Sequence, residues 1–129
     1  MSMRILVADD HQLVRRGVNS ILSKQAGWEV CGEAEDALQA FEKTCELRPD
    51  LILLDISMPG GNGLDTARKI REKVPEVKIL MMSHYDAAQF LPTALARGAD
   101  GCIDKSRLAL DLIDAIKGVQ DSSASKASS

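Results

Sequence analysis

Residues 51–63 read LILLDISMPGGNG, and the interpretation of the whole chain starts from this stretch. Four large aliphatic residues in succession before Asp55 predict a strand buried on both faces, as in a parallel sheet. Pro59 and the two glycines after it end the strand, because proline cannot donate to a ladder. Asp55 is therefore expected at the carboxyl end of a central strand, where open α/β sheets bind ligands. Taken alone, it is better explained as a loop cap.

The segments on either side repeat this strand-and-helix arrangement. Short apolar runs predict four further strands, at residues 4–8, 28–33, 77–82 and 101–103. Helical spacing of apolar residues between them predicts five helices, at 13–22, 36–48, 64–74, 87–97 and from 108 onward. The fold class is therefore α/β. We expect a flavodoxin-like (βα)5 doubly wound parallel sheet with strand order 2-1-3-4-5.

Composition restricts the class of protein. A chain of 129 residues with 45% hydrophobic and 27% charged residues is one ordinary globular domain. A net charge of −3 and 3% aromatic residues argue against direct nucleic acid binding. No apolar run approaches the roughly 20 residues of a membrane span, and the first residues are not a secretory signal, so we expect a cytoplasmic location. The cysteines are predicted to be buried thiols: Cys31, Cys45 and Cys102.

The ends of the helical pattern carry two further expectations. Residues 1–119 form the predicted domain, and residues 120–129 form a flexible Ser-rich tail that resembles the start of an interdomain linker. Pro92 lies inside the predicted helix 87–97, where a proline costs ~3 kcal/mol. We therefore expect that helix either to start late, with Pro92 in its first turn, or to be kinked. Tyr85 is a candidate for a switching aromatic in the segment before it.

Polar residues follow four neighbouring strands of the predicted sheet. In the expected strand order their carboxyl ends share one edge, and they present Asp9 and Asp10, Asp55, Ser83 and Lys105. Clustered carboxylates repel one another unless a cation lies among them. Mg²⁺ prefers oxygen ligands and commonly takes one or two carboxylates together with a phosphate. Each residue has an ordinary alternative role as a cap, a loop hydroxyl or a surface charge, but the combination predicts a metal and phosphoryl site.

These motifs resemble the receiver domain of a two-component response regulator, from near Met3 to about Val119. The matching pieces are ILVADDH (5–11), DLILLDISMPGGNG (50–63), SHY (83–85) and GADGCIDK (98–105). The segment DDHQLVRRG (9–17) is most similar to the NarL/FixJ branch. The resemblance implies a phosphorylation-controlled switch in transcription regulation rather than an enzyme. Such a domain catalyses only its own phosphorylation and dephosphorylation.

The resemblance also implies roles for particular residues. Asp55 would accept a phosphoryl group from a phosphohistidine on a sensor histidine kinase, and Ser83 and Lys105 would bind the phosphoryl oxygens. Asp10 and Asp55 would bind Mg²⁺ directly together with the backbone carbonyl of Ser57, and Asp9 would act through a metal-bound water. The implied partners are the kinase and a DNA-binding output domain beyond the C-terminus. A second copy of the chain, in a phosphorylation-dependent homodimer, is a third alternative.

Two departures from the family pattern stand out. The chain ends in the Ser-rich tail at the point where members of the NarL/FixJ branch usually continue into a helix-turn-helix domain. Two explanations are open, a receiver excised from a longer protein and a stand-alone receiver. The family usually has Tyr or Phe three residues before the lysine, and Cys102 occupies that place. This change affects the usual coupling in which an aromatic side chain turns inward on phosphorylation.

Two other functions compete with the receiver interpretation. A haloacid-dehalogenase-like phosphatase also forms an aspartyl phosphate, but it places a second aspartate two residues after the nucleophile, where this chain has Ser57. A flavodoxin-like cofactor carrier needs a first loop that binds phosphate, which Asp9 and Asp10 would repel. His11 and His84 are expected at the rim of the site rather than among its ligands, because the site is rich in hard oxygen donors.

Overall fold

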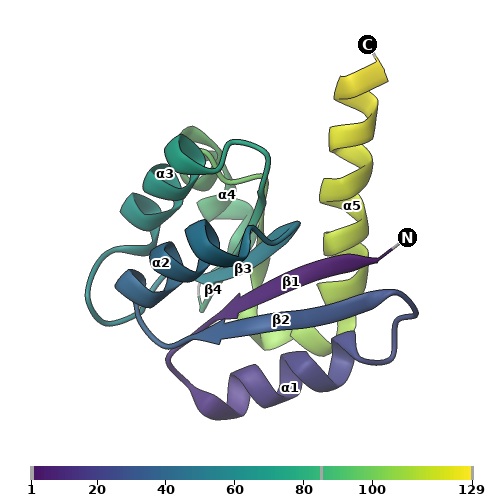
Figure 1. Ribbon diagram of the computed structural model, residues 1–129, viewed down its shortest axis with the longest axis horizontal. Coiled ribbons are helices and arrows are strands. Elements are labelled where there is room, and N and C mark those ends of the chain that lie inside the picture. The colour runs from purple at the N-terminus through teal and green to yellow at the C-terminus, as the bar shows by residue number, and fades with distance from the viewer. Residues whose placement is uncertain (1, 85, 129) are drawn as a thin grey trace.

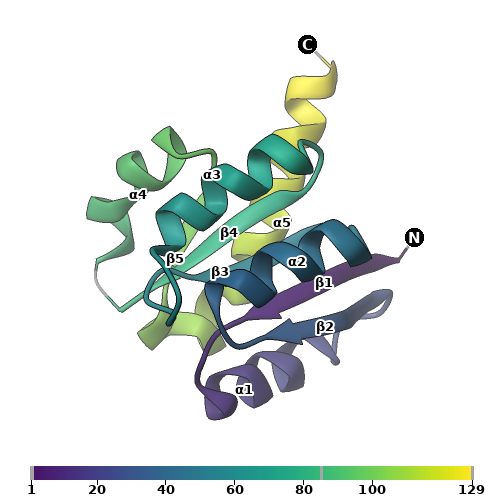
Figure 2. The ribbon, with the colours of Figure 1, turned by 60° about the vertical axis from the view of Figure 1, so that its left-hand side comes forward.

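The computed structural model of the chain describes residues 2–84 and 86–120 in full, and residues 121–128 by their backbone alone. Five parallel strands form one sheet in the order β2-β1-β3-β4-β5, with helices on both of its faces (Figures 1 and 2). The strands are β1 (Met3–Ala8), β2 (Trp28–Ala34), β3 (Leu51–Asp55), β4 (Lys78–Ser83) and β5 (Gly101–Asp104). The helices are α1 (Gln12–Leu22), α2 (Ala37–Leu47), α3 (Gly63–Lys73), α4 (Ala87–Ala96) and α5 (Leu108–Ser128), with a 3₁₀ turn η1 (Lys105–Arg107) before α5. The predicted flavodoxin-like fold and strand order are confirmed.

Strand β3 lies at the centre of the sheet, between β1 and β4. All five of its residues are buried, which agrees with the continuous apolar run and extends it to Asp55. The parallel register pairs Ala8 with Leu54 and Asp55 with Met82. The carboxyl ends of β1, β3 and β4 therefore lie side by side at one edge of the sheet.

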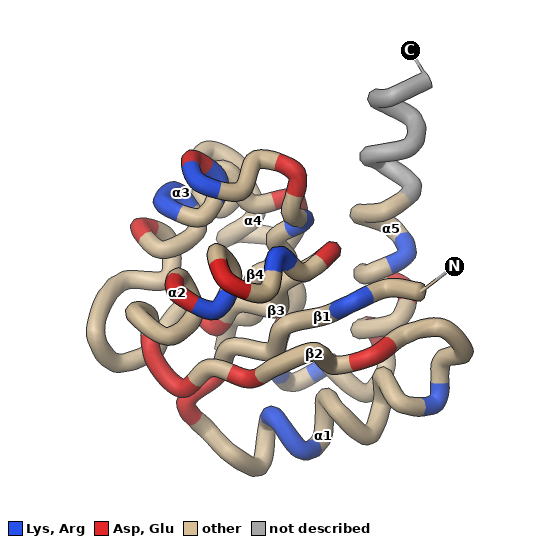
Figure 3. The backbone as a smooth tube through the Cα atoms, viewed as in Figure 1, with Lys and Arg blue, Asp and Glu red and all other residues tan. Residues whose placement is uncertain are grey.

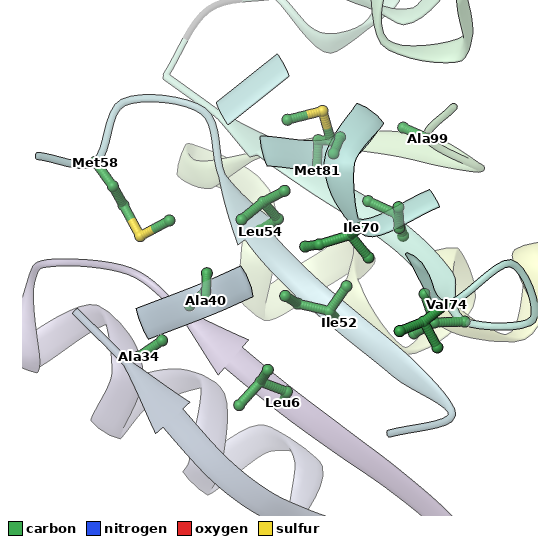
Figure 4. Packing of buried hydrophobic residues seen from close by; sticks show 14 of the residues in the cluster. Leu6, Ala34, Ala40, Ile52, Leu54, Met58, Ile70, Val74, Met81 and Ala99 are labelled. Carbon is green, nitrogen blue, oxygen red and sulfur yellow. The ribbon is translucent and has the colours of Figure 1, made fainter. Parts of the chain in front are cut away.

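The two faces of the sheet carry separate apolar clusters because successive side chains along a strand point to opposite faces. One cluster lies under α2, α3 and α4 and includes Leu6, Ile52, Leu54, Ile70 and Met81 (Figure 4). The other lies under α1 and α5, with strand residues such as Val7 and Leu53 and helix residues such as Val18 and Ile116. Burial on both faces explains why the central strands need no polar residue until they end.

Side-chain caps and a proline set the ends of helices α2 and α3. The carboxylate of Asp36 accepts a hydrogen bond from the backbone N–H of Gln39 at 2.8 Å, and α2 begins directly after it. Helix α3 ends at Lys73, two residues before Pro75. Its first turn is capped by Asn62, whose side chain accepts from the N–H of Leu64 at 2.8 Å.

Helix α4 rules out one of the two expected alternatives. It begins at Ala87, and Pro92 lies in its second turn, so the late start is wrong, while the kink stays a prediction. The Asp86 side chain caps the helix by accepting from the N–H of Ala88 at 2.9 Å, and this early cap permits the first turn before the proline. Pro92 has no N–H to donate to the carbonyl of Ala88, so the second turn of α4 lacks one helical hydrogen bond. The switching role suggested for Tyr85 falls on a residue outside those described.

Three other expectations concern the chain end, the cysteines and membranes. The backbone of α5 runs to Ser128, and from residue 121 the side chains lie outside those described, so the division into a domain at residues 1–119 and a flexible tail at 120–129 stays a prediction. The three cysteines are free but only half-buried, which corrects the prediction of buried thiols, because each lies at the border of a core cluster: Cys31, Cys45 and Cys102. None of the helices, over the residues described, is both long and apolar enough to cross a bilayer.

Candidate functional site

Three strand ends bring opposite charges into contact at the carboxyl edge of the sheet. Asp9 follows β1, Asp55 ends β3 and Lys105 follows β5. The Lys105 Nζ lies 2.5 Å from Asp9 Oδ2 and 3.0 Å from Asp55 Oδ2. The two carboxyl residues are 0% and 1% exposed, and the lysine side chain is 4% exposed. A buried ammonium group therefore joins two buried carboxylates across three strands.

Asp9 is held by the turn from β1 to α1. Its N–H continues the β1–β2 ladder by donating to the carbonyl of Ala34 at 3.0 Å. Its Oδ1 accepts from the N–H of His11 at 2.8 Å, an Asx-type turn that precedes the helix. Asp10 lies in this turn, and its Oδ1 is 3.2 Å from Nδ1 of His11. Figure 3 shows the acidic residues that gather where β1 and β2 end.

Asp55 is held by the loop between β3 and α3. The N–H of Ser57 donates to Asp55 Oδ1 at 3.1 Å. The loop then returns so closely that a Cβ on Gly63 would lie 2.6 Å from the Cα of Ile56 and 2.8 Å from the carbonyl oxygen of Asp55. Only glycine fits at that position, and the N–H of Gly63 donates to the carbonyl of Ile56 at 3.0 Å. The loop is thus closed against the residue that carries the central carboxylate.

The remaining predicted residues lie at the same edge. Ser83 ends β4, is 2% exposed and stands opposite Asp104 in the β4–β5 register. His11 and His84 lie at the rim, with ring centroids 6.5 Å apart and ring planes at 84°. The His11 side chain is 59% exposed, as expected of a rim residue. His11 nevertheless reaches further in than the sequence suggested, because its Nδ1 lies 3.2 Å from both Asp9 Oδ1 and Asp10 Oδ1.

The donor set at this edge suits a small divalent cation. Ligand atoms of Asp9, Asp10, His11 and Asp55 all lie within 4.8 Å of one another. Lys105 Nζ is the ion-pair partner of two of these oxygens, Asp9 Oδ2 and Asp55 Oδ2, and His11 Nδ1 lies 3.2 Å from a third, Asp10 Oδ1. Three carboxylates face one ammonium group, so the site has an excess of negative charge. Hard oxygen donors with unbalanced charge are the ligands that Mg²⁺ prefers, and the residues present therefore fit it.

Sequence reasoning missed one residue beside the site. Arg15 is 8% exposed, and its Nη1 donates to the backbone carbonyl of Asp9 at 2.7 Å. The helical spacing contains the signal, because Arg15, Val18 and Leu22 recur at three and four residues and form the buried stripe of α1. An arginine on the core face of a helix needs a polar partner inside the protein.

Cys102 occupies the place three residues before Lys105 and is half-buried. It packs with Phe90 of α4 against the apolar cluster under α2, α3 and α4. Burial raises the pKa of the Cys102 thiol to about 11, despite a hydrogen bond from the backbone of Ile103 that lowers it. The side chain is therefore a neutral, small apolar group at neutral pH.

Comparison with known proteins gives the family. The model of the response regulator receiver domain matches residues 5–117. The oxygen regulatory protein NreC of Staphylococcus epidermidis is 42% identical over 118 residues, which cover 91% of this chain and 54% of NreC. The response regulator protein VraR of Staphylococcus aureus is 37% identical over 117 residues, which cover 91% of this chain and 56% of VraR. The chain thus spans about half the length of these curated relatives.

Solved structures agree with this match. A LuxR-family two-component response regulator from Aurantimonas sp. SI85-9A1 is 31% identical with a TM-score of 0.86, over 92% of this chain and 85% of that one. The receiver domain of the response regulator NarL from Mycobacterium tuberculosis is 34% identical with a TM-score of 0.78, over 91% of this chain and 98% of that one. The comparisons bring no support for a haloacid-dehalogenase-like phosphatase. The chain belongs to the response regulator receiver domain family and is of the NarL/LuxR type.

Proposed function

We propose that this receiver domain accepts a phosphoryl group on Asp55 from a phosphohistidine of a sensor histidine kinase. The observation that carries the proposal is the contact of Lys105 with the buried carboxylates of Asp9 and Asp55, at 2.5 and 3.0 Å. A lysine held at a carboxylate offers a point charge for the oxygens of an incoming phosphoryl group. Ser83, at the adjacent strand end, would donate to the same oxygens.

The proposed transfer is a displacement at phosphorus. A carboxylate oxygen of Asp55 attacks the phosphorus atom, a new P–O bond forms and the P–N bond of the phosphohistidine breaks. The electron pair of that bond stays on the imidazole nitrogen, which takes up a proton from solvent. A separate reaction restores the resting state: water attacks the phosphorus and gives a proton to solvent, the P–O bond to Asp55 breaks, and inorganic phosphate leaves. The domain would catalyse only these two reactions on itself.

Asp9, Asp10, Asp55 and the backbone carbonyl of Ser57 would hold Mg²⁺. The bound ion would supply charge neutralisation for the transferring oxygens. The chain's own residues prepare the site for it: the N–H of Ser57 orients Asp55 through Oδ1, and the N–H of His11 orients Asp9 through Oδ1. These two backbone donors leave Oδ2 of both aspartates to Lys105.

We propose further that phosphorylation changes the surface that a DNA-binding output domain or a second receiver contacts, in cytoplasmic transcription regulation. The support is the match to about half the length of NreC and VraR. A further 26% identical structure, RcsB of Salmonella enterica serovar Typhimurium, was solved bound to the promoter rprA in the presence of the phosphomimetic BeF₃⁻, and this chain covers 61% of it.

Intact mass spectrometry after incubation with acetyl phosphate and Mg²⁺ tests the phosphoacceptor. We expect one phosphoryl group on the parent protein and none on Asp55→Asn, because the amide nitrogen and oxygen of asparagine are poor nucleophiles. Asp65→Asn, an exposed carboxylate on α3, is the matched control and should take up one group as the parent does. An unmodified parent, or a second stable phosphate on another residue, contradicts the proposal.

A further inference from the structure

Arg15 poses a question that the phosphoacceptor chemistry does not answer. It lies in the first turns of α1, a helix that is exposed on one side, yet the residue is 8% exposed. Its neighbour Arg16 is exposed to solvent, so a cationic residue in this turn does not have to be buried. Burying a guanidinium group is costly unless its donors find partners. The partners show what the burial achieves.

The guanidinium group of Arg15 joins three segments. Its Nε donates to Glu33 Oε1 at 2.7 Å, near the carboxyl end of β2, and its Nη2 lies 3.5 Å from Glu35 Oε1. Its Nη1 donates to the backbone carbonyl of Asp9 at 2.7 Å, at the carboxyl end of β1. Glu33 is itself held by the side-chain amide of Asn19, one turn further along α1, at 3.3 Å. The arginine is therefore oriented by a carboxylate and in turn holds a backbone carbonyl.

That carbonyl belongs to the peptide unit between Asp9 and Asp10. Strand β1 ends at Ala8, and the N–H of Asp9 is the last of this segment to donate to β2. A peptide unit is planar, so holding its carbonyl oxygen also sets the direction of the following N–H and the position of the next Cα. With the N–H of Asp9 on Ala34 and its carbonyl on Arg15, the backbone that presents both acidic side chains is held on two sides.

From this geometry we infer that Arg15 is a positioning residue for the acidic site. It touches neither the phosphoryl group nor the metal, and it acts by holding the Asp9–Asp10 peptide so that both carboxylates face Asp55. Glu33 is its orienting partner. The inference rests on the proposed function for the role of Mg²⁺ in phosphorylation, whereas Mg²⁺ binding itself can be measured without phosphate. Outer residues that orient metal ligands typically change metal affinity by about 10–100-fold when removed.

The decisive variant is Arg15→Met/Glu33→Gln, which removes the guanidinium group without leaving the half-buried Glu33 carboxylate unpaired. Its Mg²⁺ dissociation constant, from calorimetric titration of the full chain, should rise about 10-fold or more. Its urea unfolding should stay cooperative. In acetyl phosphate uptake followed by intact mass, the Mg²⁺ concentration for half-maximal rate should rise by the same factor, while the maximal rate at saturating Mg²⁺ stays close to the parent's. A general loss of structure would instead lower the maximal rate.

Two further variants separate positioning from charge. Arg16→Met removes an equal charge from the same turn and should leave the Mg²⁺ dissociation constant unchanged; an equal loss there would overturn the inference. Arg15→Lys keeps the charge, but one ammonium group cannot reproduce the planar fork, so it should bind Mg²⁺ more weakly than the parent. This variant decides the matter if the double variant does not fold.

The outcomes distinguish this inference from the proposed function. Parent-like Mg²⁺ affinity in both Arg15 variants would overturn the role of Arg15, whatever happens to phosphate. A parent protein that binds Mg²⁺ but takes up no phosphate would contradict the proposed function, and the Mg²⁺ titrations would still test Arg15.

Discussion

The two edges of the sheet hold their charged groups in different ways. At the amino edge, Arg71 of α3 donates to the backbone carbonyls of Gly98, Pro75 and Val77 at 2.6–2.9 Å and to Asp100 Oδ2 at 2.6 Å. Asp100 also accepts from the N–H of Ile79 at 2.8 Å. Lys78 Nζ lies 3.8 Å from Asp100 Oδ1, so two positive groups surround this one carboxylate, and Arg71 and Asp100 also have fixed backbone partners.

At the carboxyl edge the balance is different. Asp9, Asp10 and Asp55 lie around one lysine, which pairs with Asp9 Oδ2 and Asp55 Oδ2, so the carboxylates outnumber the ammonium group. Clustered carboxylates repel one another unless a further cation lies among them. The comparison teaches that burial of charge alone does not mark the site. What marks it is an excess of one charge whose partners have to come from outside the chain.

The largest effect is expected for Lys105→Met. Without the ammonium group, Asp9 and Asp55 remain buried and repel each other, and the free energy of unfolding at pH 7 should fall by about 3–5 kcal/mol in the absence of Mg²⁺. Urea unfolding with and without Mg²⁺ measures this, and saturating Mg²⁺ should restore part of the loss. Acetyl phosphate should still react, though more slowly, because the lysine is not the nucleophile. Lys69→Met, at an exposed position of α3, is the control. An equal loss of stability in that variant would contradict a special role for the buried ammonium group of Lys105.

The next effect concerns the metal. Mg²⁺ at about 100 times its dissociation constant should stabilise the parent by about 2.7 kcal/mol, by mass action. Asp10→Ala should lose most of this stabilisation, because it removes a ligand and relieves repulsion in the metal-free state. The melting temperature as a function of Mg²⁺ concentration is the measurement. A rise in Asp10→Ala as large as in the parent would count against Asp10 as a ligand.

A smaller effect on stability is expected at the amino edge. Arg71→Met removes the guanidinium donor from Asp100 and from three backbone carbonyls and should lower the free energy of unfolding by about 2 kcal/mol. The loss is smaller than for a fully buried pair because the arginine side chain is 27% exposed and Asp100 keeps the N–H of Ile79. Mg²⁺ affinity should not change, because this network lies at the opposite edge. Calorimetric titration of the variant with Mg²⁺ is the measurement. A dissociation constant that rose as stability fell would contradict the separation of the two edges.

The smallest effect is expected from a carboxylate at the carboxyl edge that is already satisfied. Hydrogen bonds from the hydroxyl and the N–H of Ser106 lower the pKa of Asp104, with a smaller contribution from Arg107. Because folding lowers the pKa of Asp104, its ionised carboxylate stabilises the folded state at pH values above the unfolded pKa of about 4. This stabilisation is lost as the pH falls through the lower pKa of the folded state. Urea midpoints between pH 5 and pH 3 should therefore fall less steeply in Ser106→Ala than in the parent. An equal slope would show that these bonds do not matter.

The fold could be predicted from the sequence because the apolar residues of each strand indicate that the strand is buried. The apolar run before Asp55 and the breaks after it indicate a central strand without any knowledge of its neighbours. Right-handed crossovers then leave few strand orders, and the observed order is the predicted one. Because the carboxyl ends of parallel strands share an edge, the gathering of Asp9, Asp55 and Lys105 also follows from the sequence.

Only the tertiary structure decided which atoms meet. The contacts of Lys105 with two carboxylates depend on strand register and on the conformation of a long side chain. Neither can be predicted from the local sequence pattern. The late start considered for α4 was wrong because Asp86 caps the helix at its beginning, and a proline in the second turn removes one hydrogen bond without preventing the first turn. Arg15 was missed because helical spacing gives the face of a residue but not the partner across it, which here is a backbone carbonyl from another element. The spacing of residues along the chain determines which face of a helix or strand a side chain lies on. The distances between side chains are set only when separate elements pack together.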